Sequence, residues 1–358
     1  MVQSPLKVLV AGGGTAGHIE PALAVADALV REYQAEVIAL GTARGLETEL
    51  VPARGYELML IDPVPVPRKP SMALAKLPFR VVRAVKQAKD ILVQHKIDAV
   101  VGFGGYVSAP AYLAARWARV PFVVHEANAS AGMANKLGVW LGGLGLNAVE
   151  NSGMKGDVVG VPIRAELSVP PTPEKIAAGY AKWGLDPAKK TLLVTGGSQG
   201  ARSINNAVAG AVPRITEAGF QILHAYGKKN DKPAEHPGYE SVSYIDDMDL
   251  ALAVADLIVS RAGAMTVAEV TAAAVPAIYV PLPHGNGEQA LNALPIVEAG
   301  GAQLVPDAEL SGDKLAEQVI ALLRDDDIHM HMSRVAAATG LGKAADEVAR
   351  RIVDLVKR

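Results

Sequence analysis

One unit occurs twice in this chain: an apolar strand, a glycine-rich turn and a helix. Residues 7–30 read KVLVAGGGTAGHIEPALAVADALV, and residues 191–212 repeat the pattern as TLLVTGGSQGARSINNAVAGAV. Such a unit opens a Rossmann-type domain, in which parallel strands alternate with helices. The chain has 358 residues, more than one hydrophobic core usually holds. The repeat therefore predicts an α/β fold of two Rossmann-like domains, whose parallel sheets face each other across a cleft.

A proline-rich stretch at residues 166–173 separates the two repeats and predicts a linker. We place the N-terminal domain at residues 1–165 and the C-terminal domain at 166–358. The sequence does not decide which domain the last helix, about 343–357, packs on. Residues 1–165 hold 17 Lys and Arg against 13 Asp and Glu, a net charge of +4, whereas the remainder holds 18 against 24, a net charge of −6. The two signs indicate different partners, and the overall charge of −2 gives no case for nucleic acid.

Several classes of protein are excluded by what the sequence lacks. There is no cysteine, which rules out disulfides, thiolate zinc sites and cysteine nucleophiles. The first residues run directly into a strand, without the apolar region of a signal peptide. The longest uncharged run, residues 99–115, is interrupted by three glycines and a proline and is a poor membrane span. We therefore expect any membrane contact to be peripheral, and the sequence predicts neither a metal nor a cofactor.

The first glycine turn, residues 12–17, matches the G-x-G-x-x-G pattern of dinucleotide-binding domains. That reading requires an acidic residue at the end of the second strand, and residues 41–44 there read GTAR. We therefore disfavour a nicotinamide cofactor. His18 follows the turn at a helix N-terminus, where a histidine can act as a general base near neutral pH. A histidine that only packs in the wall of the site fits the sequence equally well.

The second glycine turn, residues 196–202, is expected to form an anion site from backbone N–H groups, the Ser198 hydroxyl and the following helix. It lacks the G-K-[ST] of a P-loop, so a departing diphosphate is a better guest than a hydrolysed triphosphate. The alternative is a tight turn that binds nothing.

Further polar loops follow other predicted strands, at 102–110, 125–128, 260–269 and 281–292. In open α/β sheets, ligands bind along the edge where the strands end. The loop at 102–110 brings backbone amides and the hydroxyls of Tyr106 and Ser108 to this edge. Glu269 has the chemistry to accept both hydroxyl protons of a ribose, although a solvated helix charge is the plainer reading.

Together these motifs resemble the MurG family of bacterial glycosyltransferases, and the resemblance covers essentially the whole chain. Its most specific pieces are GGSQGAR at 196–202, GFGGYVSAP at 102–110, YIDDM at 244–248, SRAGAMTVAE at 260–269 and EQALNALP at 288–295. The resemblance implies a GT-B fold, with the sugar-nucleotide donor on the C-terminal domain and a lipid acceptor on the N-terminal one. It implies transfer of N-acetylglucosamine (GlcNAc) from UDP-GlcNAc to lipid I, which is undecaprenyl-pyrophosphoryl-MurNAc-pentapeptide, giving lipid II for peptidoglycan.

The resemblance also assigns roles to matching positions. His18, Asn128 and Arg164 are implied in catalysis, with His18 as the general base. Donor binding is implied for Thr15, Ala16, Gly17, Asn128, Arg164, Ser198, Ile245, Ala264, Met265, Thr266, Val267, Ala268, Glu269, Gln289 and Asn292. Acceptor binding is implied for Gly104, Gly105, Tyr106, Ser108, His125 and Glu126. Ala16, Ala127 and Glu288 depart from the family pattern, and the last two leave the fine geometry of sugar recognition open.

The lipid acceptor requires contact with a bilayer. Seven basic residues and no acid lie between residues 68 and 89, and each basic group near an anionic surface contributes about 1 kcal/mol. We predict a docking surface made of Leu74, Lys76, Leu77, Phe79, Arg80 and Arg83, against an ordinary solvated helix as the alternative. The implied location is the cytoplasmic face of the bacterial cell membrane, at its inner leaflet, with cell-wall and cell-division proteins as further candidate partners.

Three rival functions remain open at the level of sequence. One is a GT-B enzyme with another lipid acceptor, which shares the donor half of the family. Another is a UDP-GlcNAc 2-epimerase, which shares the two-domain layout but needs no lipid surface. The third is a catalytically silent nucleotide-binding protein.

Overall fold

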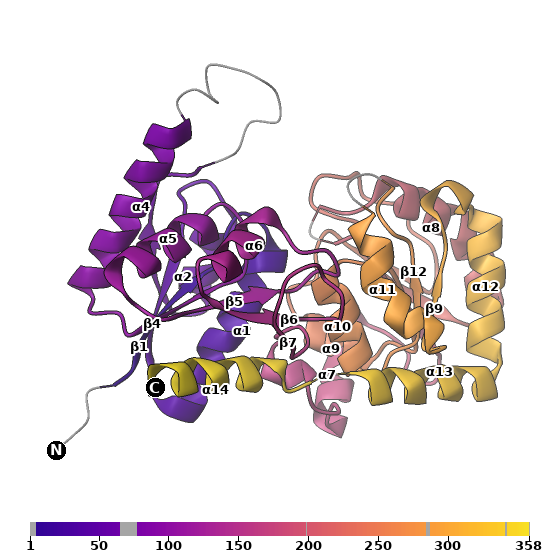
Figure 1. Cartoon of the computed structure of the whole chain (residues 1–358). Coiled ribbons are helices and arrows are strands. Elements are labelled where there is room, and N and C mark those ends of the chain that lie inside the picture. Colours follow the sequence, from indigo (N-terminus) through magenta and orange to yellow (C-terminus); the bar gives the residue numbers. More distant parts are fainter. Residues whose placement is uncertain (1–4, 65–76, 198, 284–286, 341, 358) are drawn as a thin grey trace. The chain divides into compact units, whose positions relative to one another are not determined.

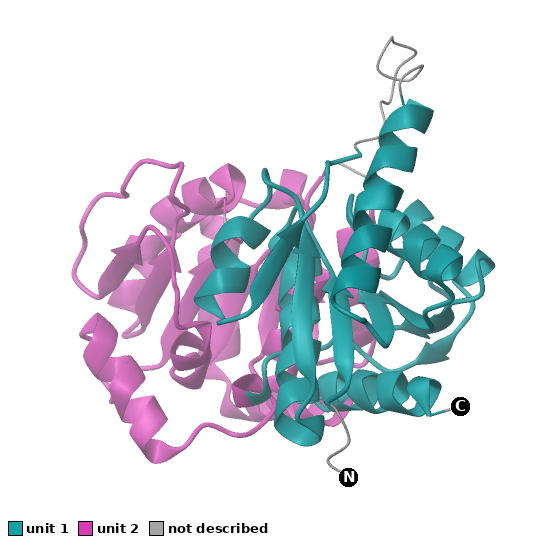
Figure 2. Ribbon diagram, turned by 90° about the vertical axis from the view of Figure 1, so that its left-hand side faces the viewer, with its two compact units in different colours: residues 1–165, 342–358 teal, residues 166–341 magenta. Residues whose placement is uncertain are grey.

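The computed structural model describes residues 5–64, 77–197, 199–283, 287–340 and 342–357. The chain divides into two compact units (Figures 1 and 2). Unit 1 consists of residues 1–165 together with 342–358, and unit 2 consists of residues 166–341. The chain therefore leaves unit 1, builds unit 2 and returns.

Unit 1 is built on a parallel sheet, in which the described residues supply seven strands in the order β3-β2-β1-β4-β5-β6-β7. The strand order reverses between β1 and β4, which are neighbours in the middle of the sheet. The carboxyl ends of these two strands flank the switch point, where ligands bind in such folds. The bounds are β1 Lys7–Ala11, β2 Glu36–Gly41, β3 Glu57–Leu60, β4 Ala99–Gly102, β5 Phe122–Glu126, β6 Leu144–Asn147 and β7 Asp157–Val158.

Helices cover both faces of this sheet, as the alternation along β1 requires. Val8 and Val10 face a core that includes buried residues of α1 and α14. Leu9 and Ala11 face the opposite core, which includes buried residues of α4 and α5. The helical bounds in this unit are α1 Ala16–Tyr33, α2 Glu47–Ala53, α4 Leu77–Gln94, α5 Ser108–Ala118, α6 Met133–Trp140 and α14 Ala344–Val356, with the 3₁₀ turn η1 Ala165–Leu167 at the boundary between the units.

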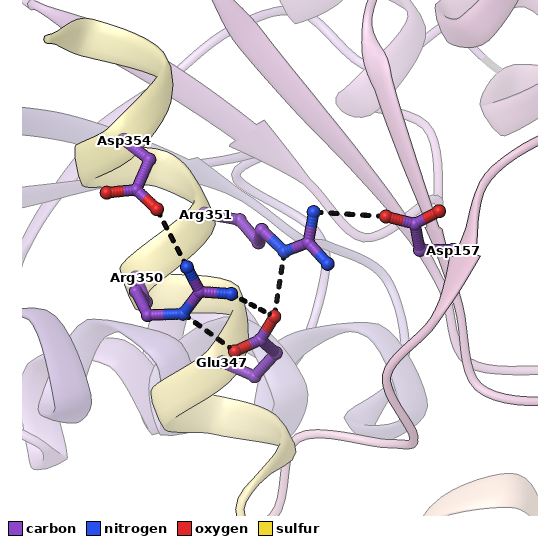
Figure 3. A network of polar contacts seen from close by, with 5 residues as sticks. All are labelled: Asp157, Glu347, Arg350, Arg351 and Asp354. Carbon is purple, nitrogen blue, oxygen red and sulfur yellow. Dashed lines mark hydrogen bonds and ion pairs between the residues drawn. The ribbon is translucent and has the colours of Figure 1, made fainter.

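The last helix, α14, packs in unit 1 and thereby answers the question that the sequence left open. Val348 and Ile352 are fully buried against the core that α1 shares. A charged network lines its outer side (Figure 3). Glu347 accepts hydrogen bonds from Arg350 at 2.6 Å and from Arg351 at 2.7 Å, and these bonds lower the pKa of Glu347 to about 2. Arg351 also pairs with Asp157 of β7 at 3.0 Å, which ties the returning helix to the edge of the sheet.

Unit 2 repeats the architecture with six parallel strands among the described residues, in the order β10-β9-β8-β11-β12-β13. Its strands are β8 Thr191–Thr195, β9 Gln221–Ala225, β10 Tyr239–Val242, β11 Leu257–Ser260, β12 Ala277–Tyr279 and β13 Ala302–Leu304. Its helices are α7 Pro173–Trp183, α8 Arg202–Glu217, α9 Met248–Ala253, α10 Ala264–Ala272, α11 Glu288–Glu298, α12 Gly312–Arg324 and α13 Asp326–Thr339, with a 3₁₀ turn, η2 Asp307–Glu309. The core of this unit joins α8 and α12 to one face of the sheet. Here too the switch point falls between the first strand, β8, and β11.

Candidate active site

The first glycine turn, residues 12–17, connects β1 to α1 and fixes His18 in the first turn of that helix. A methyl group added at Gly12 would lie 2.3 Å from the carbonyl oxygen of His18, so the turn closes tightly on the helix. The Thr15 hydroxyl lies 3.2 Å from Nδ1 of His18. When Nδ1 carries the ring hydrogen and donates it to Thr15, the lone pair of the neutral imidazole is on Nε2.

The loop after β4 passes directly beside the His18 ring. A methyl group added at Gly104 would lie 3.1 Å from Cδ2 and Nε2 of His18, and one added at Gly105 would lie 3.4 Å from Nδ1. Both glycines have left-handed backbones, with φ of +93° and +79°, which other residues rarely adopt. Tyr106 is 53% exposed beside this pair, and its ring lies near Gly14. The structure thus brings together His18, Gly104, Gly105 and Tyr106, which the sequence placed on separate loops.

Ser108 supports this loop from inside the unit. The side chain is fully buried. Its hydroxyl accepts a hydrogen bond from the Gly104 N–H at 2.9 Å and is 2.7 Å from the Gly104 carbonyl and 3.1 Å from that of Ala11. In this structure the hydroxyl bonds inward and holds the loop of Gly104 and Gly105 in shape, and the acceptor role that the resemblance implies for Ser108 stays a prediction.

The loop after β5 is organised in the same way by buried side chains. Glu126 accepts hydrogen bonds from the N–H groups of Asn128 at 2.9 Å and Gly132 at 3.0 Å, and from Nδ2 of Asn135 at 2.9 Å. Its carboxyl group is turned into the unit and is 3% exposed. Asn128 is half-buried, and its Nδ2 also donates to Glu126 at 3.2 Å. Direct contact of the Glu126 side chain with an acceptor is not supported, because the carboxylate is used to shape the turn that carries Asn128.

His125 is fully buried and its ring lies 5.5 Å from that of Phe103. Burial lowers its pKa to about 4, against a smaller opposing effect of the hydrogen bond between Nε2 and the Gly160 carbonyl, 2.9 Å apart. The side chain is used within the unit, and the acceptor role that the resemblance implies for His125 stays a prediction. Its bond to Gly160 joins the end of β5 to the segment 160–165, which carries the half-buried Arg164.

Sequence reasoning missed Glu47, which lies under the first glycine turn. Glu47 begins α2 and is fully buried. It accepts hydrogen bonds from the Gly14 N–H at 2.9 Å, from the Thr42 N–H at 2.8 Å and from the Thr42 hydroxyl at 3.0 Å. The only available signal was a glutamate after the glycines at 41 and 45, and its partner Gly14 is 33 residues away.

The second glycine turn, residues 196–201, connects β8 to α8. Gly197 and Gly200 have φ of +83° and +72°, and Gly200 lies against the turn at Tyr226 and Gly227 so closely that an added methyl group would be 2.2 Å from the Tyr226 carbonyl. Ala201 is the N-cap of α8, and among the described residues no side chain caps this helix. Ser198, which was predicted to face the diphosphate, lies outside the described residues. The uncapped first turn of α8 presents its N–H groups as an anion site would.

Two buried clusters that the sequence did not reveal support this turn. His224 lies between the Tyr239 hydroxyl at 2.7 Å and Oδ1 of Asn205 at 3.1 Å. Burial lowers the pKa of His224 to about 4, so the ring is neutral. Beside them, Arg261 donates to Oδ1 of Asp307 at 2.5 Å and to the Ser203 hydroxyl at 2.8 Å. Asn205 and Ser203 belong to the first turn of α8, so both clusters fix the start of that helix.

The remaining predicted donor residues follow β10, β11 and β12. Gln289 is the second residue of α11, and its Oε1 accepts the Leu282 N–H at 2.9 Å. Asn292 is buried, and its Nδ2 donates to the Ala262 carbonyl at 3.3 Å. Ile245 is buried in the loop after β10. The half-buried residues of the 264–269 stretch form the beginning of α10 and are Ala264, Met265, Thr266, Val267, Ala268 and Glu269.

The predicted membrane surface is described only in part. Leu74 and Lys76 lie outside the described residues, and α4 begins at Leu77. Phe79 and Val82 of α4 are 79% and 65% exposed. Among the described residues, every helix is too short or too polar to cross a lipid bilayer.

The two described basic residues of this surface, Arg80 and Arg83, have partners within unit 1. Arg80 donates to the Pro63 carbonyl at 2.8 Å, and Arg83 pairs with Asp62 at 2.7 Å. The Arg83 side chain nevertheless remains 73% exposed. Fewer basic groups are therefore available to an anionic surface than the sequence suggested, because Asp62, which pairs with Arg83, lies just before the counted segment 68–89.

Comparisons with known proteins agree over nearly the whole chain. Residues 8–142 match the glycosyltransferase family 28 N-terminal domain, and residues 191–348 match the glycosyltransferase family 28 C-terminal domain. A protein of Corynebacterium glutamicum (strain R) is 60% identical over 354 residues, covering 98% of this chain and 99% of its own. A protein of Mycolicibacterium smegmatis is 52% identical, covering 98% and 94%. Both are named UDP-N-acetylglucosamine–N-acetylmuramyl-(pentapeptide) pyrophosphoryl-undecaprenol N-acetylglucosamine transferase.

Among solved structures, MurG of Acinetobacter baumannii superposes with a TM-score of 0.76 at 28% identity, covering 98% of this chain and 100% of the other. The predicted fold class, two parallel-sheet α/β domains of the GT-B type, is confirmed by this likeness and by the sheet topology.

Proposed function

We propose that this chain, which belongs to glycosyltransferase family 28 and within it to the MurG family, transfers GlcNAc from UDP-GlcNAc to lipid I and so makes lipid II. The observation that carries the reaction is the identity of 60% over 98% of the chain with a relative whose name specifies this transfer. The name of that relative specifies both the donor and the lipid-linked acceptor. The rival readings as an epimerase, as a silent nucleotide binder or as an enzyme for another lipid are therefore less well supported.

For the chemical step we propose that His18 is the general base. Nε2 takes the proton from the 4-hydroxyl of MurNAc, and the oxygen forms a bond to the anomeric carbon of GlcNAc. The bond from that carbon to the diphosphate breaks and UDP leaves. The configuration at the anomeric carbon is thereby inverted. The contact of 3.2 Å between the Thr15 hydroxyl and Nδ1 supports this assignment, because it orients the ring and, when Nδ1 donates the bond, leaves the lone pair on Nε2. A positioned base contributes about 10²–10⁴-fold to such a step.

For the leaving diphosphate we propose the second glycine turn and Arg164. Among the described residues no side chain caps the first turn of α8, which supplies backbone N–H groups and the equivalent of about +0.5 charge, and Arg164 supplies a full positive charge. Electrostatic stabilisation of developing charge is usually the larger part of catalysis. Loss of Arg164 or Ser198 is therefore expected to lower kcat at least as much as loss of His18.

Recognition of the substrates is proposed for the loops at the other strand ends. We assign uracil to the backbone of Ile245, the ribose to Glu269 within the 264–269 stretch, and the sugar to Gln289, Asn292 and Asn128. Thr15, Ala16 and Gly17 complete the donor site from the first glycine turn. For the acceptor we retain Gly104, Gly105 and the exposed Tyr106.

The lipid tail of the acceptor requires a peripheral contact with the inner leaflet at the cytoplasmic face of the membrane. The exposed Phe79 and Val82 and the largely exposed Arg83 support docking through the start of α4, since apolar side chains and basic groups together give reversible binding to anionic lipid. If vesicles rich in anionic lipid do not retain the protein at low salt, this docking surface is ruled out.

The decisive assay offers lipid I with labelled UDP-GlcNAc and, separately, with UDP-GalNAc and UDP-glucose. We expect labelled lipid product from UDP-GlcNAc alone. Product formed without lipid I, or from a different lipid acceptor only, would overturn the proposed function.

His18→Ala tests the base in the same assay. We expect kcat to fall by about 10²–10⁴-fold, with the KM for UDP-GlcNAc changed less than about threefold, because His18 is not among the residues proposed to hold the donor. His95→Ala, a histidine elsewhere in unit 1, is the matched control and should behave as the wild type. A His18→Ala enzyme with the kcat of the wild type would remove His18 as the base.

A further inference from the structure

We propose that Glu47 is a positioning residue for this reaction: its buried carboxylate holds the first glycine turn and thereby places His18. This inference rests on the proposed function, since it concerns the base of that reaction. It assigns a role to a side chain that neither touches the substrates nor belongs to the loops already discussed.

The contacts of Glu47 show that its carboxyl group serves the turn. Its two oxygens accept hydrogen bonds from two backbone N–H groups and one hydroxyl, those of Gly14 and Thr42. All three partners are donors, which is the pattern that an acceptor-only carboxylate satisfies. A fully buried charge is unfavourable unless hydrogen bonds compensate it. The three hydrogen bonds compensate the burial of the Glu47 carboxyl group and at the same time fix the backbone at Gly14 and Thr42.

The glycines around Glu47 show how closely the turn fits the carboxyl group. A methyl group added at Gly13 would lie 3.0 Å from Oε1 of Glu47, and one added at Gly45 would lie 1.7 Å from Oε2. On its other side, the Gly13 carbonyl would be only 2.4 Å from a methyl group at Gly105. The turn is thus held between Glu47 below and the loop of Gly104 and Gly105 above.

His18 is coupled to this arrangement at two points. Thr15, which follows Gly14 directly, contacts Nδ1 of His18, and the ring lies beside Gly104 and Gly105. A shift of the turn therefore moves the hydroxyl that orients the ring, while the loop on the other side stays in place because Ser108 holds it. Misplacement of a catalytic group by about 1 Å can lower a rate by about 10²-fold.

Glu47→Gln is the most informative substitution because it keeps the shape of the side chain. An amide has one oxygen and one NH₂ group, so one of the donors, at Gly14 or at Thr42, meets another donor. We expect kcat to fall about ten- to hundredfold, with the affinity for UDP itself changed less than about twofold, because the proposed contacts of the diphosphate, the second glycine turn and Arg164, lie outside the first glycine turn. Asp27→Asn is the matched control: Asp27 lies on α1, accepts from Arg54 at 2.9 Å and from Tyr56 at 2.7 Å, and its loss should affect stability without lowering kcat.

A double variant separates positioning from a merely structural role. In the His18→Ala background, Glu47→Gln is expected to lower kcat less than about twofold, because a residue that acts through His18 has nothing left to position. The same tenfold or larger loss in both backgrounds would overturn the inference. Thr42→Val removes only the hydroxyl bond to Glu47 and should lower kcat by a few fold. This variant keeps the test decisive if Glu47→Gln does not fold. A Thr42→Val enzyme with unchanged kcat would then contradict the role of Glu47.

The two proposals fail in different ways. If the wild-type protein transfers no GlcNAc to lipid I, the proposed function falls. If the wild type and His18→Ala behave as expected while Glu47→Gln keeps its kcat within twofold, only the role of Glu47 is wrong.

Discussion

The two glycine turns have similar sequences and the same place in their units, yet a carboxylate bonds to the backbone of the first, whereas the carboxylate beside the second bonds to side chains of Ser203 and Arg261. In the first turn, the Gly14 N–H is bonded to the carboxylate of Glu47. In the second, no described side chain caps the first turn of α8, and the groups that support it are the neutral His224 with Asn205 and the Arg261–Asp307 ion pair, both members of which bond to Ser203. The first turn is therefore unsuited to a phosphate, because a buried negative charge already occupies it, whereas the second is suited to one.

This difference explains why a G-x-G-x-x-G pattern is a poor guide to phosphate binding. The pattern describes backbone shape, which both turns share. What the turn binds depends on the charge of the side chain that lies beneath it. In unit 1 that side chain comes from α2, and the turn is used to place a histidine. In unit 2 the Gly197 N–H donates to a neutral group, the Thr195 hydroxyl, at 3.2 Å.

The strongest test of this comparison is to give the second turn the charge of the first. Ala201, the N-cap of α8, has the extended backbone that an N-cap aspartate adopts, with φ of −138° and ψ of 109°. Ala201→Asp should occupy the first N–H groups of α8 and repel the diphosphate. Loss of two charge-assisted hydrogen bonds at about 1.5 kcal/mol each predicts a Kd for UDP about a hundredfold higher, measured by calorimetry. Ala201→Ser adds a neutral cap and should weaken binding less than about tenfold; wild-type affinity in Ala201→Asp would contradict an anion site at α8.

Two glycine substitutions, one in each unit, are expected to change different parameters: kcat in unit 1 and the Kd for UDP in unit 2. Gly104→Ala places a methyl group against the His18 ring at a residue with φ of +93°, and kcat should fall by about thirtyfold while UDP affinity stays within twofold. Gly200→Ala forces the second turn away from Tyr226, and the Kd for UDP should rise by about tenfold. Steady-state kinetics and UDP binding on both variants check the pair, each serving as the control of the other. A fall of both parameters in both variants would mean that the turns do not divide the work.

The smallest expected effect concerns a feature that both units share, a buried neutral histidine. The pKa values of His125 and His224 are lowered by burial to about 4, below the value of about 6.5 in an unfolded chain. The unfolded state therefore binds more protons between these pH values, and the stability that the neutral histidines contribute is fully present above pH 6.5 and is lost as the pH falls towards 4. At pH 5.5 we expect each unit to lose about 1 kcal/mol, a shift of a few degrees in its thermal midpoint.

Calorimetry at pH 7.5 and 5.5 checks this expectation. His224→Gln should remove the pH dependence of the unit 2 transition and leave that of unit 1. The exposed His331→Gln is the control and should leave both. Equal midpoints at the two pH values in the wild type would exclude buried neutral histidines as a source of acid sensitivity.

Much of this molecule follows from its sequence. The repeated strand, turn and helix predict two parallel-sheet units, and loops after strands bring His18, Gly104 and Tyr106 to one edge, because the ends of parallel strands meet there. The burial of Ser108, His125 and Glu126 does not follow, since a polar residue just after a strand looks the same whether it faces a ligand or bonds inward. Glu47 was missed because its partner is distant in sequence, and a glutamate at the start of a helix usually needs no other explanation.

The return of α14 to unit 1 makes unit 2 an insertion within the first folding unit rather than a second module that follows it. Val348 and Ile352 complete the hydrophobic layer beneath α1, but the ribosome makes them only after all of unit 2. During synthesis, unit 1 must therefore wait with an exposed apolar face on α1 until its final helix emerges. A substitution that disrupts α14 would accordingly destabilise the sheet of unit 1, although the last strand of that sheet ends more than 150 residues before α14 begins.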